Sequence, residues 1–288
     1  MIFSVRGVNL CGDISTTARE KIMNMGMSGS FLVSSMTDAA YEAARIVQSR
    51  EHLKAHSKGE VGNIVTAADE KSEKRIKDIL RDIFPKCVFL AEESEATISR
   101  ENFAEHELVF VIDPIDGTTN YKYGIPSSAI SIGAWNYGKP IAAVVYDLVN
   151  DDIYTATVGG GVIKNAKRMV NKNIVTDLKK AIADSDWGYA DTPKETVRIL
   201  NRLAANVMAV RILGSAVMSL VFAATGQYTC YIHNTMKPFD VGAAVLMLQE
   251  LGLMVTNWDG EPYSIFDEKI IVAPPHLHNE FCSLSLGS

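Results

Sequence analysis

The stretch DPIDGTTN, residues 113–120, places two carboxylates three residues apart and leads directly into a Gly-Thr-Thr turn. The preceding residues 108–112, LVFVI, form a continuous apolar run with β-branched side chains, which predicts a buried strand that ends at Asp113. Functional side chains of layered α/β proteins gather at such strand ends. The stretch therefore predicts a mixed α and β fold with a polar site where this strand stops.

The side chains of this stretch suit a hard divalent cation. Mg2+ prefers oxygen ligands and commonly takes one or two carboxylates together with the phosphate oxygens of a substrate. Asp113 and Asp116 offer the carboxylates. Pro114 stiffens the turn, so the carbonyl oxygen of Ile115 is available as a further ligand. A helix that opens within residues 117–119 would point its first N–H groups at a phosphate. Taken alone, however, an Asp-x-x-Asp pair is more often a simple turn.

Two further acidic segments favour the metal interpretation. Residues 87–90, CVFL, predict a short buried strand that ends in the Glu-Glu-Ser turn 92–94. Residues 237–244, KPFDVGAA, place Asp240 at the start of an apolar helix. Because all three segments put carboxylates at strand ends or helix starts, they can converge on one site.

Apolar periodicity outlines the rest of the fold. Residues 37–48 and 69–83 have the pattern of amphipathic helices. The runs 129–135 and 141–146 predict a hairpin, and 152–157 and 161–163 continue the β pattern. From residue 180, short strands alternate with longer helices, which is typical of an α/β half. The predicted elements of that half are strands 181–184, 208–212, 228–232 and 254–257, helices 194–206 and 215–225, and one helix after Phe239.

Together the motifs resemble the inositol monophosphatase family, which belongs to a superfamily of lithium-sensitive, metal-dependent sugar phosphatases. They occur in family order from about residue 36 to the C-terminus. The motifs are VTAAD at 65–69, AEES at 91–94, DPIDGTTN at 113–120, GSA at 214–216 and FDVGAA at 239–244. The resemblance implies an α+β / α/β fold, the layered α-β-α-β-α sandwich of the inositol monophosphatase and fructose-1,6-bisphosphatase type.

By this resemblance the acidic residues would hold two to three Mg2+ ions. The implied ligands are Glu92, Asp113 and the Ile115 carbonyl for one ion, Asp113, Asp116 and Asp240 for a second, and Glu92 and Asp69 for a third, weaker ion. Clustered carboxylates repel one another, so a divalent ion relieves them.

The implied reaction is hydrolysis of a phosphate monoester by direct in-line attack of water, without a covalent phosphoenzyme. Metal ions in such sites lower the pKa of water and neutralise charge on the leaving oxygen. The implied catalytic residues are Thr118, which positions the water, Asp69, which accepts the hydroxyl proton of Thr118, and Glu92. Taken alone, Thr118 could equally be a helix N-cap.

Substrate contacts are implied on both sides of the metals. They are Asp116, Gly117, Thr118, Gly214, Ser215, Ala216, His233 and Asp240; the N–H groups of Gly117 and Thr118 would hold phosphate oxygens. The N–H groups at 214–216 could contact a substrate hydroxyl or a second phosphate, although an ordinary serine cap fits as well. Asp186 and Trp187, after a predicted strand, are further candidates for the pocket wall, although most tryptophans simply pack.

The chain departs from the family pattern mainly at His233. Animal members carry a glutamate seven residues before the last metal-binding aspartate, and that glutamate binds inositol hydroxyls. Imidazole forms different hydrogen bonds from a carboxylate, so the departure bears on whether inositol 1-phosphate is the substrate. Taken alone, His233 is more often a pocket-wall or core histidine than a catalyst. Phe239 replaces the usual tryptophan, and Ala91 replaces a glycine.

Composition predicts an intracellular enzyme with an ample core. The chain has 288 residues, 47% of them hydrophobic, and a net charge of -6. We expect an N-terminal extension at 1–35 that is poorly ordered, an α+β half at 36–175 with the metal-binding acids, and an α/β half at 176–288 with the last metal-binding aspartate and the substrate contacts. A mis-assigned start or a transit peptide are alternatives for the extension.

Charge and cysteine usage exclude several other classes. A mildly acidic chain without a basic cluster is a poor nucleic-acid binder. The four cysteines have no CxxC spacing, which speaks against structural zinc and a disulfide framework and favours a reducing cytoplasm. No window has the length and apolarity of a membrane span, so we expect no membrane partner. A homodimer is implied by the resemblance alone.

These features predict a Mg2+-dependent phosphomonoesterase that acts on a small polyol or sugar phosphate of the inositol 1-phosphate type. Within the same superfamily the alternatives are fructose-1,6-bisphosphatase, histidinol-phosphate phosphatase and a 3'-phosphoadenosine nucleotide phosphatase. A non-catalytic regulator on this fold is an alternative of another class. The crowded carboxylates argue against a regulator, because a protein that binds no metal has no physical reason to keep them.

Overall fold

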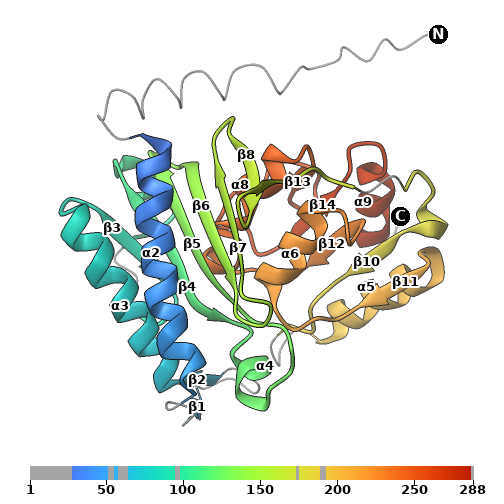
Figure 1. Ribbon diagram of the computed structural model, residues 1–288. Helices are drawn as coiled ribbons and strands as arrows, with labels where there is room; N and C mark the ends of the chain where they lie inside the picture. The colour runs from blue at the N-terminus through green and yellow to red at the C-terminus, as the bar shows by residue number, and fades with distance from the viewer. Residues whose placement is uncertain are drawn as a thin grey trace.

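Two large β-sheets alternate with three layers of helices in the computed structural model, and a third sheet has only two short strands (Figure 1). The structure describes residues 28–50, 55–57, 64–94, 98–172, 175–188 and 193–286. The predicted α-β-α-β-α sandwich is therefore confirmed. Most of the predicted N-terminal extension, residues 1–27, lies outside the described residues.

The larger sheet has seven strands in the order β3-β4-β5-β6-β7-β8-β9. They are β3 Val88–Ala91, β4 Val109–Asp116, β5 Ala129–Asn136, β6 Lys139–Asp147, β7 Asp152–Thr157, β8 Gly161–Lys164 and β9 Lys167–Arg168. Only the β3–β4 pair is parallel; every other neighbour is antiparallel and follows along the chain. The hairpin and strands predicted for residues 129–163 are thus confirmed.

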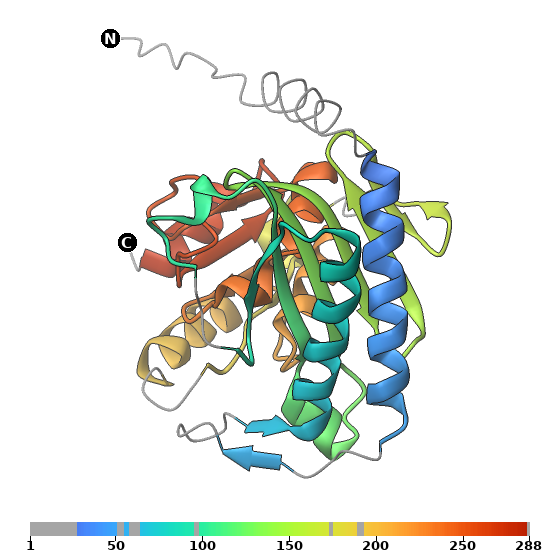
Figure 2. The same ribbon diagram turned by 90° about the vertical axis from the view of Figure 1, so that its left-hand side faces the viewer.

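Helices α2, Gly29–Gln48, and α3, Ala67–Ile83, cover the outer face of this sheet (Figure 2). The buried stripe of α2 is rich in alanine, which lets the helix lie close to the strands. The helix begins at Gly29 and not near Thr37, because Ser28 caps it by accepting the Phe31 N–H at 3.1 Å. Residues 29–35, which the sequence placed in the extension, are therefore the first turns of α2.

The smaller sheet has five strands in the order β11-β10-β12-β14-β13. They are β10 Ile182–Asp184, β11 Ala209–Arg211, β12 Cys230–His233, β13 Met254–Thr256 and β14 Ile270–Ala273. Strand β10 pairs in parallel with both β11 and β12, whereas β14 is antiparallel to both β12 and β13. The sequence did not predict β14, so this half is less purely α/β than expected.

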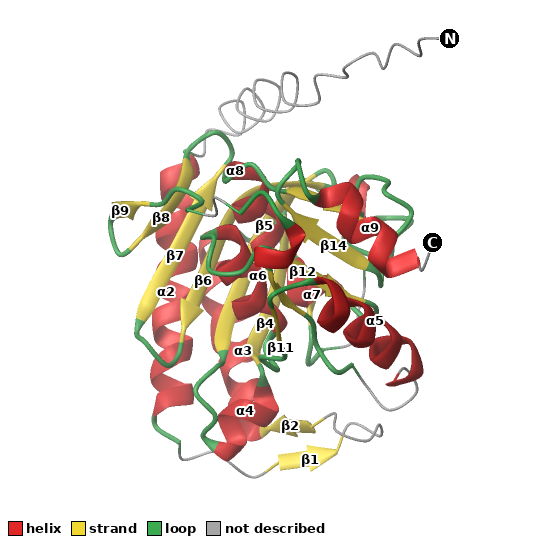
Figure 3. Ribbon diagram, turned by 90° about the vertical axis from the view of Figure 1, so that its right-hand side faces the viewer, coloured by secondary structure: helices red, strands yellow, loops and turns green. Residues whose placement is uncertain are grey.

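Helices α6, Ala216–Ala224, and α8, Ala244–Glu250, lie between the two sheets, and α5, Pro193–Asn206, and α9, His278–Leu286, cover the outer face of the smaller sheet (Figure 3). Since α6 and α8 are covered on both sides, nearly all their residues are buried. The remaining elements are short: β1 Ala55–Ser57, β2 Ile64–Thr66, α4 Thr118–Tyr123, α7 Pro238–Val241 and the 3-10 turns Phe103–Glu105 and Leu178–Lys180.

Strand β4 is buried on both faces, which explains its uninterrupted apolar sequence. Val109 and Val111 belong to the core around α6 and α8, while Phe110 and Ile112 belong to the core under α2 and α3. This alternation follows from the two-residue period of a strand. It also sets which side of the sheet each later residue of β4 faces.

The loop between α7 and α8 packs directly on the larger sheet. A Cβ on Gly133 of β5 would lie 2.1 Å from the carbonyl oxygen of Gly242, and a Cβ on Gly242 would lie 2.4 Å from Val111. The indole N–H of Trp135 donates to the same Gly242 carbonyl at 2.8 Å. The two glycines permit a contact that brings Asp240 toward the end of β4.

None of the helices within the described residues is long and apolar enough to cross a membrane.

Candidate active site

A bulge at the end of β4 turns two carboxylates to the same side. Asp113 pairs with Ser131 and Asp116 pairs with Ala129, so three steps on β4 match two steps on β5. Residues three apart in a regular strand face opposite sides, and the extra residue cancels that alternation. Ile115 consequently points into the core under α2 and α3, and Asp116 joins Asp113. The sequence predicted that the strand stops at Asp113; it continues through the bulge to Asp116.

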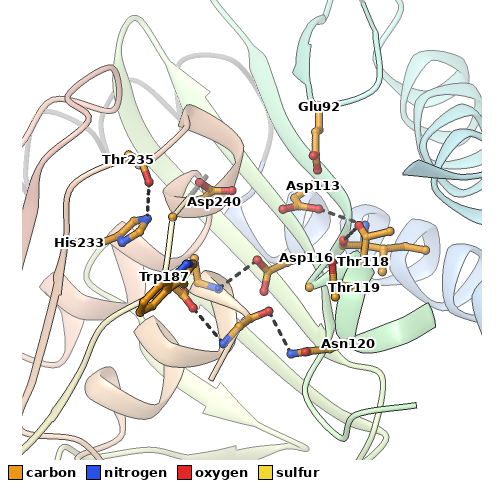
Figure 4. A pocket seen from close by; sticks show the side chains of 16 residues that line it. Glu92, Asp113, Asp116, Thr118, Thr119, Asn120, Trp187, His233, Thr235 and Asp240 are labelled. Atoms are coloured by element: carbon orange, nitrogen blue, oxygen red, sulfur yellow. Dashed lines mark hydrogen bonds between the residues drawn. The ribbon is translucent and has the colours of Figure 1, made fainter. Parts of the chain in front are cut away.

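Asp240, at the start of α7, completes a group of three carboxylates. One oxygen of each of Asp113, Asp116 and Asp240 lies within 4.8 Å of the others. The Lys237 N–H donates to Asp240 at 2.7 Å, and the Ile115 N–H donates to Asp113 at 3.1 Å. These backbone contacts hold two carboxylates that approach each other from different halves of the chain (Figure 4).

The electrostatics of this group fit a divalent cation. Burial, followed by the charge of Glu92, raises the pKa of Asp113 well above its ordinary value. Burial also raises the pKa of Asp240 well above its usual range and that of Asp116 to about 7. Among the described residues, no lysine or arginine forms an ion pair with any of the three. Oxygen donors in this arrangement are the ligands that Mg2+ prefers.

Asp116 also joins the two halves of the protein. Its carboxylate accepts the hydroxyl of Ser215 and the N–H groups of Ala216 at 3.1 Å and Val217 at 3.2 Å. A carboxylate from the larger sheet therefore occupies the N-terminus of α6, where unpaired N–H groups favour negative charge.

This contact bears on the prediction that residues 214–216 contact a substrate. The Ala216 N–H and the Ser215 hydroxyl are directed to Asp116, and the Gly214 N–H donates to Asp186 at 2.9 Å. Gly214 and Ala216 line the pocket, whereas Ser215 is buried behind it. The first groups of α6 thus position carboxylates, and a substrate contact of residues 214–216 remains a prediction.

Thr118 and Asp69 form the predicted pair. The Thr118 hydroxyl lies 2.9 Å from a carboxylate oxygen of Asp69 and 3.0 Å from the Ile115 carbonyl. Asp69 lies in the first turn of α3 and is buried, and its other oxygen accepts the N–H of Thr66 at 2.8 Å as well as the Thr66 hydroxyl. Thr118 is the first residue of α4 and does not cap it; Gly117 is the N-cap residue, with φ of 77°.

Glu92 follows β3 and lines the same pocket. The turn that carries it is held by Glu73, a buried residue of α3 that the sequence analysis missed. Glu73 accepts the Glu93 N–H at 2.7 Å and the Ser94 hydroxyl, and pairs with Lys77 at 2.7 Å. Its signal in the sequence is its place one helical turn after Asp69, on the buried stripe where a carboxylate needs partners.

The pocket has a volume of about 340 Å³ and two chemically different sides. Figure 4 shows Glu92, Asp113 and Asp116 on one side and Trp187, His233 and Thr235 on the other. His233 is buried, and its Nε2 lies 2.9 Å from the Thr235 hydroxyl. Burial lowers the pKa of His233 to about 4, so its imidazole is neutral at pH 7. His233 lines the pocket, and its contact with a substrate remains a prediction.

Five alternating layers with an acidic pocket at the junction of their halves define a hydrolase of the layered α-β-α-β-α class. The profile of the inositol monophosphatase family matches residues 31–286, so the chain belongs to that family. Inositol monophosphatase 1 of Solanum lycopersicum is 30% identical over 250 residues, 85% of this chain and 90% of that protein. The inositol-1-monophosphatase of Bacillus subtilis is 30% identical over 239 residues, 82% and 88% of the two chains.

The fold is shared with solved structures as well. The extragenic suppressor protein suhB of Bartonella henselae superposes with a TM-score of 0.81 at 28% identity, covering 88% of this chain and 98% of that one. Together with the family match, these relatives establish that the chain is a phosphatase of the inositol monophosphatase family.

Proposed function

We propose that this phosphatase is Mg2+-dependent and hydrolyses a small polyol or sugar phosphate of the inositol 1-phosphate type. The observation that carries the proposal is the convergence of Asp113, Asp116 and Asp240 within 4.8 Å in a pocket of about 340 Å³. A pocket of this size accommodates a small phosphate ester, and the names of the relatives point to an inositol phosphate.

The residues proposed to hold Mg2+ are Glu92, Asp113 and the Ile115 carbonyl for one ion, Asp113, Asp116 and Asp240 for a second, and Glu92 and Asp69 for a third. When bound, Mg2+ would lower the pKa of the attacking water and neutralise charge on the leaving oxygen. The third ion has the weakest support, because both oxygens of Asp69 already accept hydrogen bonds from Thr66 and Thr118.

The protein's own contribution is to position the water and the phosphate. Since Asp69 accepts the hydroxyl proton of Thr118, the lone pairs of the Thr118 oxygen are available to accept a hydrogen bond from water. A water held in this way would be oriented for in-line attack. The N–H groups of Gly117 and Thr118 are proposed to hold phosphate oxygens. Gly117 has no room for a side chain, because a Cβ would lie 2.9 Å from the Ser127 carbonyl.

The test is phosphate release from a panel of esters with Mg2+ and with EDTA. The panel contains inositol 1-phosphate, fructose 1,6-bisphosphate, histidinol phosphate and 3'-phosphoadenosine 5'-phosphate, which represent the alternatives within the superfamily. EDTA-sensitive release that is fastest with inositol 1-phosphate is the expected result. No release from any ester by folded, Mg2+-loaded protein would contradict the proposal and favour the non-catalytic regulator.

Three further properties belong to the same proposal. We infer lithium inhibition from the site assigned to Asp116 and Asp240, and insensitivity at tens of millimolar would argue against it. A homodimer is inferred from the family resemblance, and light scattering that shows only a monomer would reject it. A cytoplasmic location is inferred from the cysteine pattern and is tested by microscopy of the tagged full-length chain.

A further inference from the structure

The side of the pocket opposite Glu92 and Asp113 has its own chemistry. Asp186 and Trp187 follow β10, and His233 ends β12, so the C-terminal ends of two neighbouring parallel strands supply this side. We call these three residues the Trp187 wall. In the proposed function it would face the part of a substrate that lies beyond the phosphate, and nothing in the proposed catalysis uses it.

Asp186 is a carboxylate without a cationic partner. Its oxygens accept the Gly214 N–H at 2.9 Å and the Tyr231 hydroxyl at 3.3 Å, and neither donor is charged. No lysine or arginine in the described ranges forms an ion pair with it, and it lies outside the group of three carboxylates that suits a metal. A sheltered carboxylate of this kind is stabilised by a positive charge that enters with a ligand.

Trp187 places an aromatic ring in the same pocket as this carboxylate. Its side chain lines the pocket and is 53% exposed, although it directly follows the partly buried Asp186. An exposed tryptophan in a pocket offers stacking area for a ligand. The face of an indole ring also attracts ammonium groups more strongly than the other aromatic side chains do.

His233 adds no positive charge to the wall at neutral pH. The ring is buried and its Nε2 lies beside the Thr235 hydroxyl, an uncharged partner. A protonated histidine here would repel a cation, whereas a neutral imidazole does not. Among the described residues of the wall, the only formal charge is therefore the carboxylate of Asp186.

We propose that the Trp187 wall binds an ammonium group on the alcohol part of the substrate, so that the preferred ester is a phosphorylated amino sugar or amino alcohol. This inference rests on the proposed phosphatase function and specifies its substrate class. The phosphate lies at the carboxylates that suit Mg2+, and the ammonium lies between the carboxylate of Asp186 and the indole face of Trp187. The same wall disfavours a second phosphate, because it would meet the charge of Asp186.

The experiment compares glucosamine 6-phosphate with glucose 6-phosphate, which differ by an ammonium group in place of one hydroxyl. Each is used as a competitive inhibitor of p-nitrophenyl phosphate hydrolysis by the Mg2+-loaded full chain, and the ratio of the two inhibition constants is measured. The design needs neither sugar to be turned over. We expect glucosamine 6-phosphate to bind roughly tenfold more tightly, as expected for a charge-assisted contact added to a cation–π contact.

Two variants locate the preference. Asp186→Asn keeps an acceptor for the Gly214 N–H and removes the charge, so the ratio should fall to near one while glucose 6-phosphate is little affected. Trp187→Leu should lower the ratio partly. Asp78→Asn is the matched control, because this carboxylate forms an exposed ion pair with Lys74 on α3, away from the wall; its ratio should equal that of the native chain.

Equal inhibition by the two sugars in the native chain would overturn the inference. A loss of affinity in Asp186→Asn that is the same for both sugars would also overturn it, because that result would mean that Asp186 only anchors Gly214 structurally. If Asp186→Asn does not fold, the exposed Trp187→Leu decides: a lowered ratio supports the inference and an unchanged one refutes it. EDTA-sensitive hydrolysis of p-nitrophenyl phosphate tests the proposed function separately. If this hydrolysis is absent, the proposed phosphatase function is contradicted, and not the ammonium preference.

Discussion

The two sides of the pocket are built in different ways. On the carboxylate side, backbone or side-chain hydrogen bonds hold Asp113, Asp116 and Asp69 from β4, α6 and α3. On the other side, Trp187 is half exposed and His233 has one uncharged partner in Thr235. The contrast fits our proposals that the carboxylate side carries the chemistry common to many phosphate esters and that the Trp187 wall selects among them.

The largest effect is expected from Asp113→Asn. Because Asp113 is a proposed ligand of both principal Mg2+ ions, its loss should abolish EDTA-sensitive phosphate release. The fold should survive, and the metal-free variant should melt at or above the temperature of the native chain, because one repelling charge is gone. Full activity in this variant would remove the basis for treating the carboxylate side as catalytic.

Thr118→Val should lower kcat by roughly 100-fold, because the water loses its positioning hydroxyl. Thr118→Ser keeps the hydroxyl and is the control; it should retain most of the activity. Melting temperatures of both variants should stay near that of the native chain. If the two variants were equally active, Thr118 would be a structural residue and the Asp69 pair would have no role in turnover.

The metal-free protein should become less stable as the pH rises from about 4 to about 7. Burial raises the pKa of Asp116 to about 7 in the folded state, whereas the unfolded chain has the ordinary value near 3.8. The folded state therefore binds more protons in this window, its stability falls as the pH rises through it, and the part of the loss that is due to Asp116 levels off above pH 7. Melting temperatures in EDTA at several pH values test this, and Mg2+ at pH 7.5 should restore stability. A flat profile in EDTA would contradict the raised pKa.

Glu73→Gln should weaken Mg2+ binding by roughly tenfold, the range known for residues that orient metal ligands. The amide loses the charge that holds Lys77 and accepts the Glu93 N–H less strongly. Isothermal titration with Mg2+ measures the effect without turnover, and Asp78→Asn on the same helix should leave it unchanged. Wild-type Mg2+ affinity in Glu73→Gln would show that the turn that carries Glu92 keeps its conformation without the charge of Glu73.

The smallest effect is expected from His233→Gln. Glutamine can still pair with the Thr235 hydroxyl, and one neutral hydrogen bond contributes about 1 kcal/mol, or roughly fivefold in KM. We expect kcat for p-nitrophenyl phosphate to stay unchanged, with only sugar phosphates affected. A large loss of kcat for every ester would mean that His233 takes part in turnover, which would contradict the separation between a catalytic side of the pocket and a selective one.

Much of this architecture can be predicted from the sequence, because β4 and the helices carry strong periodic patterns. The misses have tertiary causes. The helix after Phe239 is broken into α7 and α8 where Gly242 packs on Val111, a contact that no local pattern reports. Strand β14 has four residues and owes its place to pairing with β12 and β13 on either side.

The site was predictable as far as its motifs reach. The residue types and spacing of residues 113–120 and Asp240 indicate a metal site, and the structure brings Asp113, Asp116 and Asp240 together. The use of the α6 N-terminus could not be predicted, because Ser215 and Asp116 lie 99 positions apart and meet only in the folded chain. Glu73 was missed for a related reason, since its partners Glu93 and Ser94 lie on another element.

The bulge in β4 makes the active site more sensitive to chain length than to residue identity. Inserting one residue between Asp113 and Asp116, with the bulge kept, would let the strand keep its pairing with β5 and its apolar character. The side chains after the insertion would change faces of the sheet, however, and the carboxylate of Asp116 would enter the apolar layer beneath α2 and α3. Over evolutionary time, single-residue insertions in this segment should therefore be rarer than substitutions beside it.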